Sequence, residues 1–450
     1  MSLRFGLLAS AAVVMSVGVV WIGYCADRAA FGPLVMAFVA LFGLYAALLM
    51  AGHRGWLSYR VLVGWGIGLR ALLLFSTPNL SDDVYRFLWD GRLAAQGIHP
   101  FAFTPAQVMQ SGQVLVGITL ELLERLNSPH YYTVYPSVCQ AVFWIAAKAF
   151  PEDVGGAILI IKIFLLTTEA VAVWALWRLR PGGWAAAAYA LHPLAIVEVV
   201  GNAHFEGAMI AFLLVGLWHL HRQHWWWASA FWALAIAVKL LPLLFLPILG
   251  LALKKRARWY FGGGVVLFSV LLFWPLWDAT VLKNLLNSLQ LYFRQFAFNA
   301  SVYYALQALL SGTNFESVVS ARLLGLLLGA VVFVGVWLLA FCRRVALLDR
   351  MVWAAGLYLL LATTVHPWYV LVPFALSLAS ERRPRWRFPA VWAAAVVLSY
   401  SHYAGGGFQE KYGWIMLEYA AVGGALLLDL LRWPHRKDAA STLAPPPVNA

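Results

Sequence analysis

The sequence predicts an all-α membrane protein that crosses the lipid bilayer many times. Of the 450 residues, 63% are hydrophobic and only 11% are charged, and the mean hydropathy is +0.77. A soluble protein of this length carries about 25% charged residues, so most side chains here do not face water. Apolar runs long enough to cross a hydrocarbon core of about 30 Å recur from one end to the other. We therefore expect one polytopic helical bundle over residues 1–432, with about 12–15 transmembrane helices.

The individual runs define the expected helices in order. They lie at 5–24, 31–50, 57–77, 136–150, 154–177, 184–200, 207–220, 225–238, 240–253, 259–277, 319–341, 351–367, 369–380, 388–403 and 414–432. Several are shorter than about 20 residues and are interrupted by Pro or Gly, as broken helices beside a cavity are. The run 136–150 is either re-entrant or has different bounds. Residues 433–450 are expected to form a disordered cytoplasmic tail.

Basic residues determine the expected orientation in the membrane. The net charge is +13, but Lys and Arg cluster in short loops, as they do in cytoplasmic loops of membrane proteins, so we expect no nucleic-acid partner. The basic loops are 53–60, 178–180, 219–224, 254–258, 342–350, 381–387 and 432–437. Two long loops, 78–135 and 278–317, then lie on the non-cytoplasmic side, and the membrane we expect is the bacterial inner membrane.

One charged pair falls inside an expected span. Lys162 and Glu169 are seven residues apart on one helical face. Ionisable groups at membrane depth usually pair with one another. We therefore expect an internal ion pair between them.

The first long outer loop contains the most informative segment. Ser81 is suited to cap a helix, and Asp82 and Asp83 follow in the first turn, where the helix dipole favours acidic residues. Gly97 is suited to end the helix, and Pro100 prevents its continuation. The pattern predicts a helix of about four turns whose apolar stripe lies at the membrane surface.

The residue types in this loop suit sugar transfer from a lipid phosphate. That reaction needs a carboxylate to accept the proton of the attacking hydroxyl, cations to balance the leaving phosphate, and an apolar groove for the lipid. Asp82 and Asp83 could supply the carboxylate. Two other interpretations remain open from the residues alone: the pair only starts the helix, or it binds Mg²⁺ or Mn²⁺.

Residues 83–92, Asp-Val-Tyr-Arg-Phe-Leu-Trp-Asp-Gly-Arg, followed by Gly-Ile-His-Pro-Phe at 97–101, resemble a known motif. It is the first outer-loop motif of polyprenyl-phosphate-mannose-dependent mannosyltransferases of the GT-C superfamily, in which Asn-Pro-Tyr usually replaces His-Pro-Phe. Further similar segments follow in the family's order, at 133–137, 192–198, 201–206, 239–247, 298–301 and 366–369. Here Ser137 replaces a family Pro, and Phe205-Glu206 replace Asn-Asp.

The resemblance implies a GT-C-type bundle with interfacial helices in the first outer loop. It implies a membrane glycosyltransferase that moves a hexose, most often mannose, from a polyprenyl-phosphate donor to a lipid or glycan acceptor, with inversion, on the non-cytoplasmic face. The catalytic candidates are Asp82 and Asp83, and no cofactor is expected unless they bind a divalent metal. The residues expected to bind substrate are Tyr85, Arg86, Asp90, Arg92, Tyr135, Glu198, Asn202, His204, Glu206, Lys239, Arg294, Asn299, His366, Trp368 and Tyr369.

Several of these residues also have a plainer interpretation. Glu198, His204 and Glu206 either contact sugar or mark a helix end that reaches water. Lys239 and Arg294 either bind the phosphate or are, respectively, a lysine that reaches the interface and a solvated loop arginine.

The residues at 366–369 and the overall function have alternatives too. His366, Trp368 and Tyr369 either stack on a sugar or belong to an interfacial aromatic belt. For the whole chain, the alternatives are a transporter or flippase of a lipid-linked sugar, and a polysaccharide polymerase or ligase. The absence of a clear internal repeat and the acidic outer loop favour the enzyme over the transporter.

Overall fold

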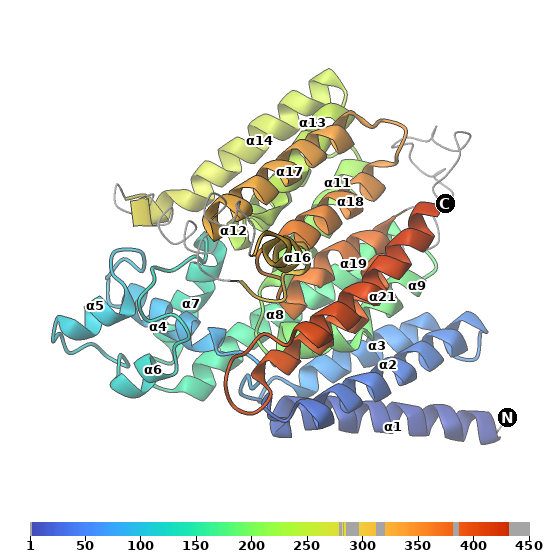
Figure 1. The fold of residues 1–450 in the computed structure, drawn as a ribbon, viewed down its shortest axis with the longest axis horizontal. Coiled ribbons are helices and arrows are strands. Elements are labelled where there is room, and N and C mark those ends of the chain that lie inside the picture. The colour runs from blue at the N-terminus through green and yellow to red at the C-terminus, as the bar shows by residue number, and fades with distance from the viewer. Residues whose placement is uncertain are drawn as a thin grey trace.

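The computed structural model describes residues 2–278, 281, 283–284, 297–311, 320–380 and 387–431. Within this part of the chain every regular element is a helix, which confirms the predicted all-α fold. The helices lie side by side, and those of the last third pack against the first (Figure 1). The predicted tail at 433–450, Arg294 and much of the second outer loop lie outside the described residues.

Six helices in the described residues are long and apolar enough to cross a membrane. They are α1 (Ser2–Cys25), α2 (Phe31–His53), α8 (Val154–Leu179), α14 (Lys255–Phe273), α17 (Ala321–Phe341) and α21 (Tyr412–Leu431). A seventh span results if α9 (Trp184–Ala190) is counted together with α10 (Pro193–Ala195) and the π-helix η1 (Ile196–Gly201), which bend by 53°. The chain is therefore an integral membrane protein.

The other predicted spans correspond mainly to shorter apolar helices. These are α7 (Ser137–Ala149), α11 (Glu206–His221), α12 (Trp225–Val238), η2 (Leu241–Phe245) with α13 (Leu246–Ala252), and η4 (Pro367–Val370) with α19 (Leu371–Ala379). The short apolar helix α16 (Ser301–Leu310) lies instead in the second outer loop, where no span was predicted. Helices α3 (Tyr59–Leu72), α18 (Leu347–Leu361), and α20 (Phe388–Ala395) followed by η5 (Val396–Tyr403), occupy three more. The exact number of membrane crossings stays a prediction.

Proline explains several of the interruptions. Pro193, Pro242 and Pro367 each occupy the first or second position of a new helical segment. Proline cannot donate the backbone hydrogen bond that would continue the preceding helix, but it fits the first turn of the next one. The breaks leave irregular backbone inside the bundle, and the site described below lies at these breaks.

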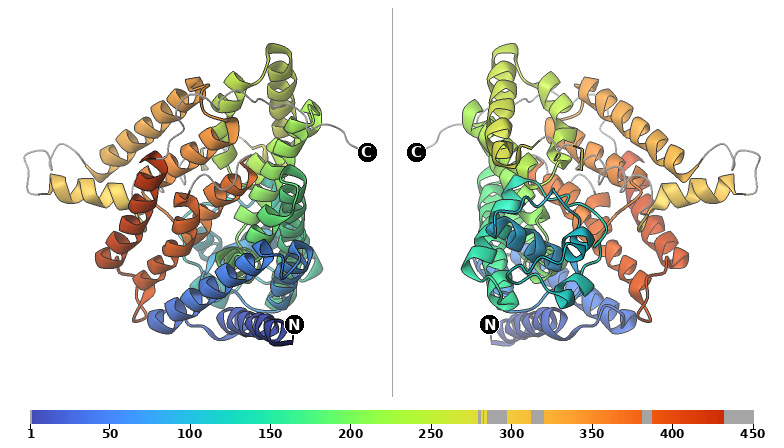
Figure 2. Two further views of the ribbon diagram at one scale, coloured as in Figure 1. Left: turned by 90° about the vertical axis from the view of Figure 1, so that its right-hand side faces the viewer. Right: turned by 90° about the vertical axis from the view of Figure 1, so that its left-hand side faces the viewer.

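The centre of the bundle consists of α8, α11 and α12. Helix α11 packs between α8 and α12, and α12 contacts α14 on its other side. Helices α18 and α19 close against this group from the C-terminal half, and one hydrophobic core extends from Met15 to Ala425. Seen from the side, α16 (golden yellow) projects beyond the other helices (Figure 2).

Helix α4 (Asp83–Ala95) is the helix predicted in the first outer loop. Its extent and the left-handed Gly97, at φ 79°, agree with the prediction. The position of α4 at the membrane surface stays a prediction, and within the protein α4 is buried over most of its circumference between α7 and the rest of the loop. Gly91 allows this burial, since a Cβ there would overlap the carbonyl group of Phe143 in α7.

The same loop contains two shorter helices, α5 (Pro105–Gln110) and α6 (Leu120–Glu124). Thr104 and Gln107 form a capping box at the start of α5, and the hydroxyl of Thr119 caps α6. These caps give the loop a defined conformation around α4.

The predicted ion pair between Lys162 and Glu169 does not form. Arg70 in α3 lies opposite Glu169 and pairs with it at 2.8 Å, with both side chains fully buried. The ammonium group of Lys162 instead donates hydrogen bonds to the carbonyl oxygens of Leu73 and Ser76 at the end of α3. Each charge therefore finds its partner in α3 or in the residues just after it, rather than on its own helix. The prediction was wrong because spacing within one span does not show that an arginine of another helix lies at the same depth.

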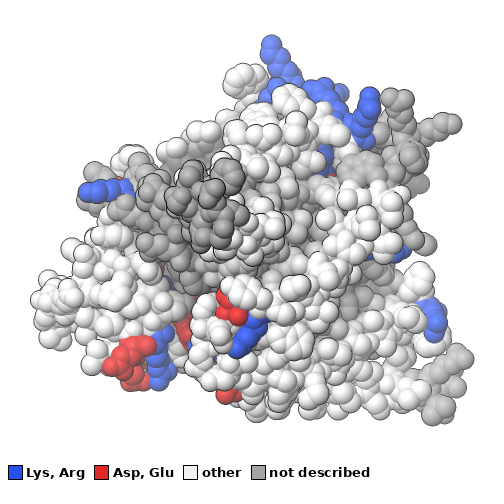
Figure 3. Space-filling view, viewed as in Figure 1, with Lys and Arg blue, Asp and Glu red and all other residues white. Residues whose placement is uncertain are grey.

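Charged side chains are unevenly distributed over the surface. On the face shown in Figure 3, acidic side chains gather at the lower left, whereas many basic ones line the upper and right-hand edges. This uneven distribution is consistent with the clustering of Lys and Arg in the basic loops of the sequence. The orientation itself stays a prediction.

Candidate active site

A cavity of about 730 Å³ lies where the start of α4 meets the broken segments of the bundle. Its wall includes residues from the end of α12, from η4 and from η5. The lining residues are Arg28, Leu80, Ser81, Asp82, Asp83, Arg86, Asn127, Ser128, Tyr131, Tyr132, Thr133, Val134, Tyr135, Pro136, Glu206, Met209, Lys239, Leu240, Leu241, Leu244, Phe298, Tyr358, Leu359, His366, Pro367, Trp368, Tyr369, Val372, Tyr400, Tyr403 and Phe408. The wall thus combines carboxylates, cations, aromatic rings and aliphatic side chains.

The cavity brings together more than half of the residues predicted from the sequence. Both catalytic candidates line it, as do seven of the expected substrate-binding residues: Arg86, Tyr135, Glu206, Lys239, His366, Trp368 and Tyr369. Those that the structure describes outside the lining are Tyr85, Asp90, Arg92, Glu198, Asn202, His204 and Asn299.

Asp83 is the carboxylate that two neighbouring side chains hold in place. Asn127 donates a hydrogen bond to its Oδ1 at 2.8 Å, and the hydroxyl of Tyr135 donates to Oδ2 at 3.2 Å. The side chain is 23% exposed. Asp83 is therefore oriented by neutral donors and still open to the cavity.

Asp82 has a different environment. Its Oδ2 forms an ion pair with Arg28 at 2.6 Å, and the guanidinium group of Arg28 also lies 5.0 Å from the ring centre of Tyr403. The helix cap also differs from the prediction, since Asp82 rather than Ser81 occupies the N-cap position and Ser81 Oγ accepts from the Asp83 amide at 3.3 Å.

Lys239 provides a cation next to an aliphatic wall. It ends α12 in an extended conformation, its ammonium group pairs with the carboxylate of Glu206, and it lies 4.6 Å from the ring centre of Tyr369. The aliphatic residues Leu240 and Leu241 follow directly and line the same cavity. A polar head group and an apolar chain could therefore be bound side by side.

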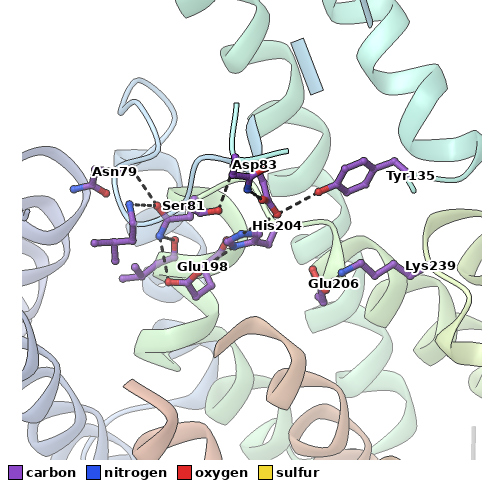
Figure 4. Close-up of polar contacts among 12 residues, drawn as sticks. Asn79, Ser81, Asp83, Tyr135, Glu198, His204, Glu206 and Lys239 are labelled. Carbon is purple, nitrogen blue, oxygen red and sulfur yellow. Dashed lines mark hydrogen bonds and ion pairs between the residues drawn. The ribbon is translucent and has the colours of Figure 1, made fainter. Parts of the chain in front are cut away.

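His204 and Glu198 lie behind Asp83 rather than in the wall (Figure 4). His204 Nε2 is 4.0 Å from Asp83 Oδ2, and His204 Nδ1 is 3.0 Å from Glu198 Oε2. Both side chains are almost fully buried. Asn202 joins this group, since its amide donates to Glu198 at 3.2 Å and its oxygen accepts from the Leu80 amide at 3.1 Å.

Aromatic rings form a stack from His204 to the second half of the chain. The Trp368 ring lies 3.4 Å from that of His204, and the His366 ring lies 4.6 Å from that of Trp368. The Phe298 ring lies 4.6 Å from that of His366. Backbone hydrogen bonds of Phe298 with Thr363 and Val365 hold this ring in place.

Asn299 lies in a second polar cluster next to the cavity. It is fully buried, with φ 52°, and its amide donates to both oxygens of Glu418 at 3.1 Å. Its backbone N–H also donates to Glu410. These contacts position the backbone beside Phe298, and a direct contact of Asn299 with substrate stays a prediction.

The predicted charged residues along α4 mostly bind the surrounding protein. Arg86 pairs with Asp90 at 2.8 Å and also donates to the carbonyl of Tyr131. Arg92 donates to the carbonyl oxygens of Gly117 and Glu152, away from the cavity.

Tyr85 lies on the other side of α4, where its hydroxyl accepts from Arg125 at 3.3 Å. Of the charged residues predicted along this helix after Asp83, only Arg86 lines the cavity. Roles of Tyr85, Asp90 and Arg92 in substrate binding stay predictions.

Sequence reasoning missed three residues that shape the site. Arg28 and Tyr400 contact Asp82 and Glu198, respectively, and Asn127 contacts Asp83. None belongs to a motif that identified the site. Arg28 had one available signal, because it is an arginine between two apolar runs on the side expected to be non-cytoplasmic.

The described residues contain no group of three His, Cys, Asp or Glu side chains suited to a metal ion. The ion pair of Asp82 with Arg28 also places a cation where a metal would have to approach that carboxylate.

Comparison with known families matches both halves of the chain. A family model described as alpha-(1->6)-mannopyranosyltransferase, N-terminal domain, matches residues 2–255. The chain belongs to this family. The MptB C-terminal domain model matches residues 297–433. These matches confirm the resemblance to mannosyltransferases inferred from the outer-loop motif.

Individual members of the family are distant relatives. An alpha-(1->6)-mannopyranosyltransferase of Mycobacterium tuberculosis is 27% identical over 154 residues, which are 32% of this chain and 24% of the relative. Alpha-(1->6)-mannopyranosyltransferase A of the same organism is 27% identical over 33% of this chain and 28% of its own. Alpha-(1->6)-mannopyranosyltransferase B of Corynebacterium glutamicum is 27% identical over 33% and 24%, respectively. The matched segment thus spans 24–28% of these relatives' lengths, and no solved structure matches the chain.

Proposed function

We propose that this alpha-(1->6)-mannopyranosyltransferase family member transfers mannose from a polyprenyl-phosphate carrier to a hydroxyl group of a lipid or glycan acceptor. The observation that carries the proposal is one cavity whose wall holds both a hydrogen-bonded carboxylate, Asp83, and a cation beside aliphatic side chains, Lys239. A general base and a phosphate-binding cation are the two groups that this transfer requires from the protein.

Asp83 acts as the general base. Its Oδ2 takes the proton of the acceptor hydroxyl, and the hydroxyl oxygen forms a bond to the anomeric carbon of the sugar. The bond from that carbon to the phosphate oxygen breaks at the same time, and polyprenyl phosphate leaves with the electron pair. Attack opposite the leaving group inverts the anomeric centre.

Lys239 binds the phosphate of the donor. In the structure its ammonium group pairs with Glu206, so the phosphate takes the place of that carboxylate or shares the cation with it. The polyprenyl chain extends along the adjoining wall of Leu240, Leu241 and Leu244. Arg28 is a second cation in the same cavity and balances charge near the acceptor end.

The aromatic residues of the cavity bind the sugars. Trp368 and Tyr369 lie in η4, and Tyr131 and Tyr135 lie in the first outer loop. Rings of this kind offer flat apolar faces together with, in tyrosine, a hydroxyl that hydrogen-bonds. The names of the relatives support mannose as the sugar and an alpha-(1->6) linkage in the product.

The reaction takes place on the non-cytoplasmic face of the bacterial inner membrane. The support is the sequence: the loop that contains Asp83 is opposite the basic loops in the predicted topology. The test is labelling, with a membrane-impermeant reagent in intact cells, of single cysteines introduced near 113 and near 256 into a variant whose three native cysteines are replaced by serine. Label at 113 and protection at 256 are expected, and the reverse pattern would refute the assigned face.

Transfer itself is tested with the purified full-length chain. The assay supplies radiolabelled polyprenyl-phosphate mannose and a synthetic octyl alpha-(1->6)-dimannoside, and measures label in the trimannoside product. Formation of an alpha-(1->6)-linked product supports the proposal. Movement of the intact labelled lipid across liposomes without transfer would instead indicate the transporter function.

A further inference from the structure

His204 lies between the proposed base and a second buried carboxylate. Its Nδ1 forms a hydrogen bond with the backbone oxygen of Glu198 at 3.0 Å, and Oε2 of Glu198 lies 3.0 Å from the same nitrogen but has no hydrogen-bond partner within the described residues. In a neutral imidazole one nitrogen donates and the other accepts. Donation to the backbone oxygen places the proton of the neutral ring on Nδ1, and Nε2 lies 4.0 Å from Asp83 Oδ2.

Burial and hydrogen bonds hold the Glu198 side chain in one orientation. It lies in the π-helix η1, is fully buried, and its Oε1 accepts hydrogen bonds from the hydroxyl of Tyr400 and from Asn202. A π-helix inserts an extra residue into a helical turn and occurs frequently at functional sites. These contacts fix the carboxylate against the His204 ring.

The His204 ring itself has little freedom to rotate. Trp368 stacks on it with an interplanar angle of 17°, and the backbone N–H of His204 donates to the carbonyl of Glu198. Within the described residues, Nε2 has no hydrogen-bond partner. One buried nitrogen is thus left unpaired on the side of the ring that faces Asp83.

Neither His204 nor Glu198 lines the cavity. Their contribution to transfer must therefore pass through a residue that does line it. Asp83 is the residue that lies within 4.0 Å of Nε2.

We propose that the Glu198–His204 pair positions Asp83 and removes the proton that Asp83 takes from the acceptor. This inference rests on the proposed transferase function. Protonated Asp83 donates from Oδ2 to His204 Nε2 after closing to hydrogen-bonding distance, about 3 Å. The O–H bond breaks, an N–H bond forms, Asp83 regains its negative charge, and Glu198 balances the imidazolium. When the product has left, the proton returns through Asp83 to water in the cavity.

The arrangement follows the logic of a nucleophile-activating triad, with an acid that orients a histidine and stabilises its charged form. Here the histidine acts on a carboxylate rather than on a hydroxyl or thiol. The buried position of Glu198 strengthens the effect, because charges interact more strongly where water is excluded.

The test compares His204→Gln, Glu198→Gln and Asp83→Asn with the double variant Asp83→Asn/His204→Gln in the mannosyl transfer assay. We expect both single replacements behind Asp83 to lower kcat by about 10- to 100-fold with an unchanged donor KM. We expect the double variant to be no slower than Asp83→Asn, because His204 acts only through Asp83. Equal kcat, a raised KM with unchanged kcat, or independent effects in the double variant would overturn the inference.

His192→Gln is the matched control. His192 is also buried in the broken span, but its ring packs among Phe42, Tyr45 and Phe374, and it does not line the cavity. Its kcat should match the wild type. If His204→Gln does not fold, the isosteric Glu198→Gln decides the question.

The wild-type protein separates this inference from the proposed function. A wild-type chain that makes no product refutes the transferase and the relay together. An active wild type with unaffected His204→Gln and Glu198→Gln variants refutes only the relay.

Discussion

Arg28 and Asp82 form an ion pair of 2.6 Å at the cavity, and this contact makes the two neighbouring aspartates chemically different. The carboxylate of Asp82 is already paired with a cation. Asp83 instead accepts from the neutral groups of Asn127 and Tyr135. The sequence could not separate two consecutive acids, but their partners assign them different roles.

Replacing the two acids separately should therefore have unequal effects. We expect Asp83→Asn to lower kcat by about 10²- to 10⁴-fold, the usual contribution of a general base, and Asp82→Asn to lower it by less than about tenfold. The measurement is initial-rate mannosyl transfer at equal amounts of membrane-inserted protein. Equal losses in the two variants would refute the assignment of the base, and full activity of the double variant would refute the mechanism.

Lys239 and Glu206 should affect donor binding in opposite directions. Lys239→Met removes the phosphate-binding cation, and we expect the donor KM to rise about tenfold or more, as for the loss of a charge-assisted hydrogen bond. Glu206→Gln removes the carboxylate that competes with the phosphate, and we expect the donor KM to fall about two- to fivefold. Titration of the labelled donor measures both.

The control for these variants is Lys148→Met, which removes an exposed lysine near the end of α7 without touching the cavity. Its donor KM should be that of the wild type. A higher KM in Glu206→Gln would show that Glu206 orients Lys239 rather than competing with the donor.

Metal chelation should leave the transfer rate unchanged within about twofold, because Asp83 as a base needs no metal and Asp82 is paired with Arg28. The measurement is transfer after dialysis against EDTA, with and without added Mg²⁺ or Mn²⁺. Loss of activity that either ion restores would favour the alternative in which the two carboxylates bind a metal.

Gly91→Ala should disturb the placement of Asp83 from a distance. The added Cβ would overlap the carbonyl group of Phe143, so α4 must move away from α7 at a cost of about 1–3 kcal/mol. We expect a lower unfolding midpoint in detergent together with lower kcat. Gly64→Ala in α3 is the control, since nothing lies within 4 Å of its added Cβ; an equal loss in both variants would show a general effect of replacing helical glycine.

Local chemistry explains which parts of the structure were predictable. The limits of α4 followed from the acidic first turn and from Gly97, because these signals lie within the helix itself. Lys239, His366 and Tyr135 were found because each belongs to a segment that resembles a family motif, and the cavity brings them together.

Long-range partners explain what was missed. Arg28 is 54 residues from Asp82, and Tyr400 is 202 residues from Glu198, so no pattern within one segment could connect them. The burial of α4 was not visible in the sequence for a similar reason: its apolar stripe indicated one apolar face, whereas the contact that buries the other side depends on Gly91 and the approach of α7.

The π-helix at Ile196–Gly201 makes backbone register a part of the chemistry. Shortening that turn by one residue would restore ordinary α-helical winding and rotate the side chains on one side of the deletion by about 100° relative to those on the other. Glu198 and His204 would both still be in the sequence, yet the carboxylate would no longer face the imidazole. A relative that keeps the glutamate and the histidine but lacks the extra residue of the π-helix would therefore have the same residue types without the contact between them.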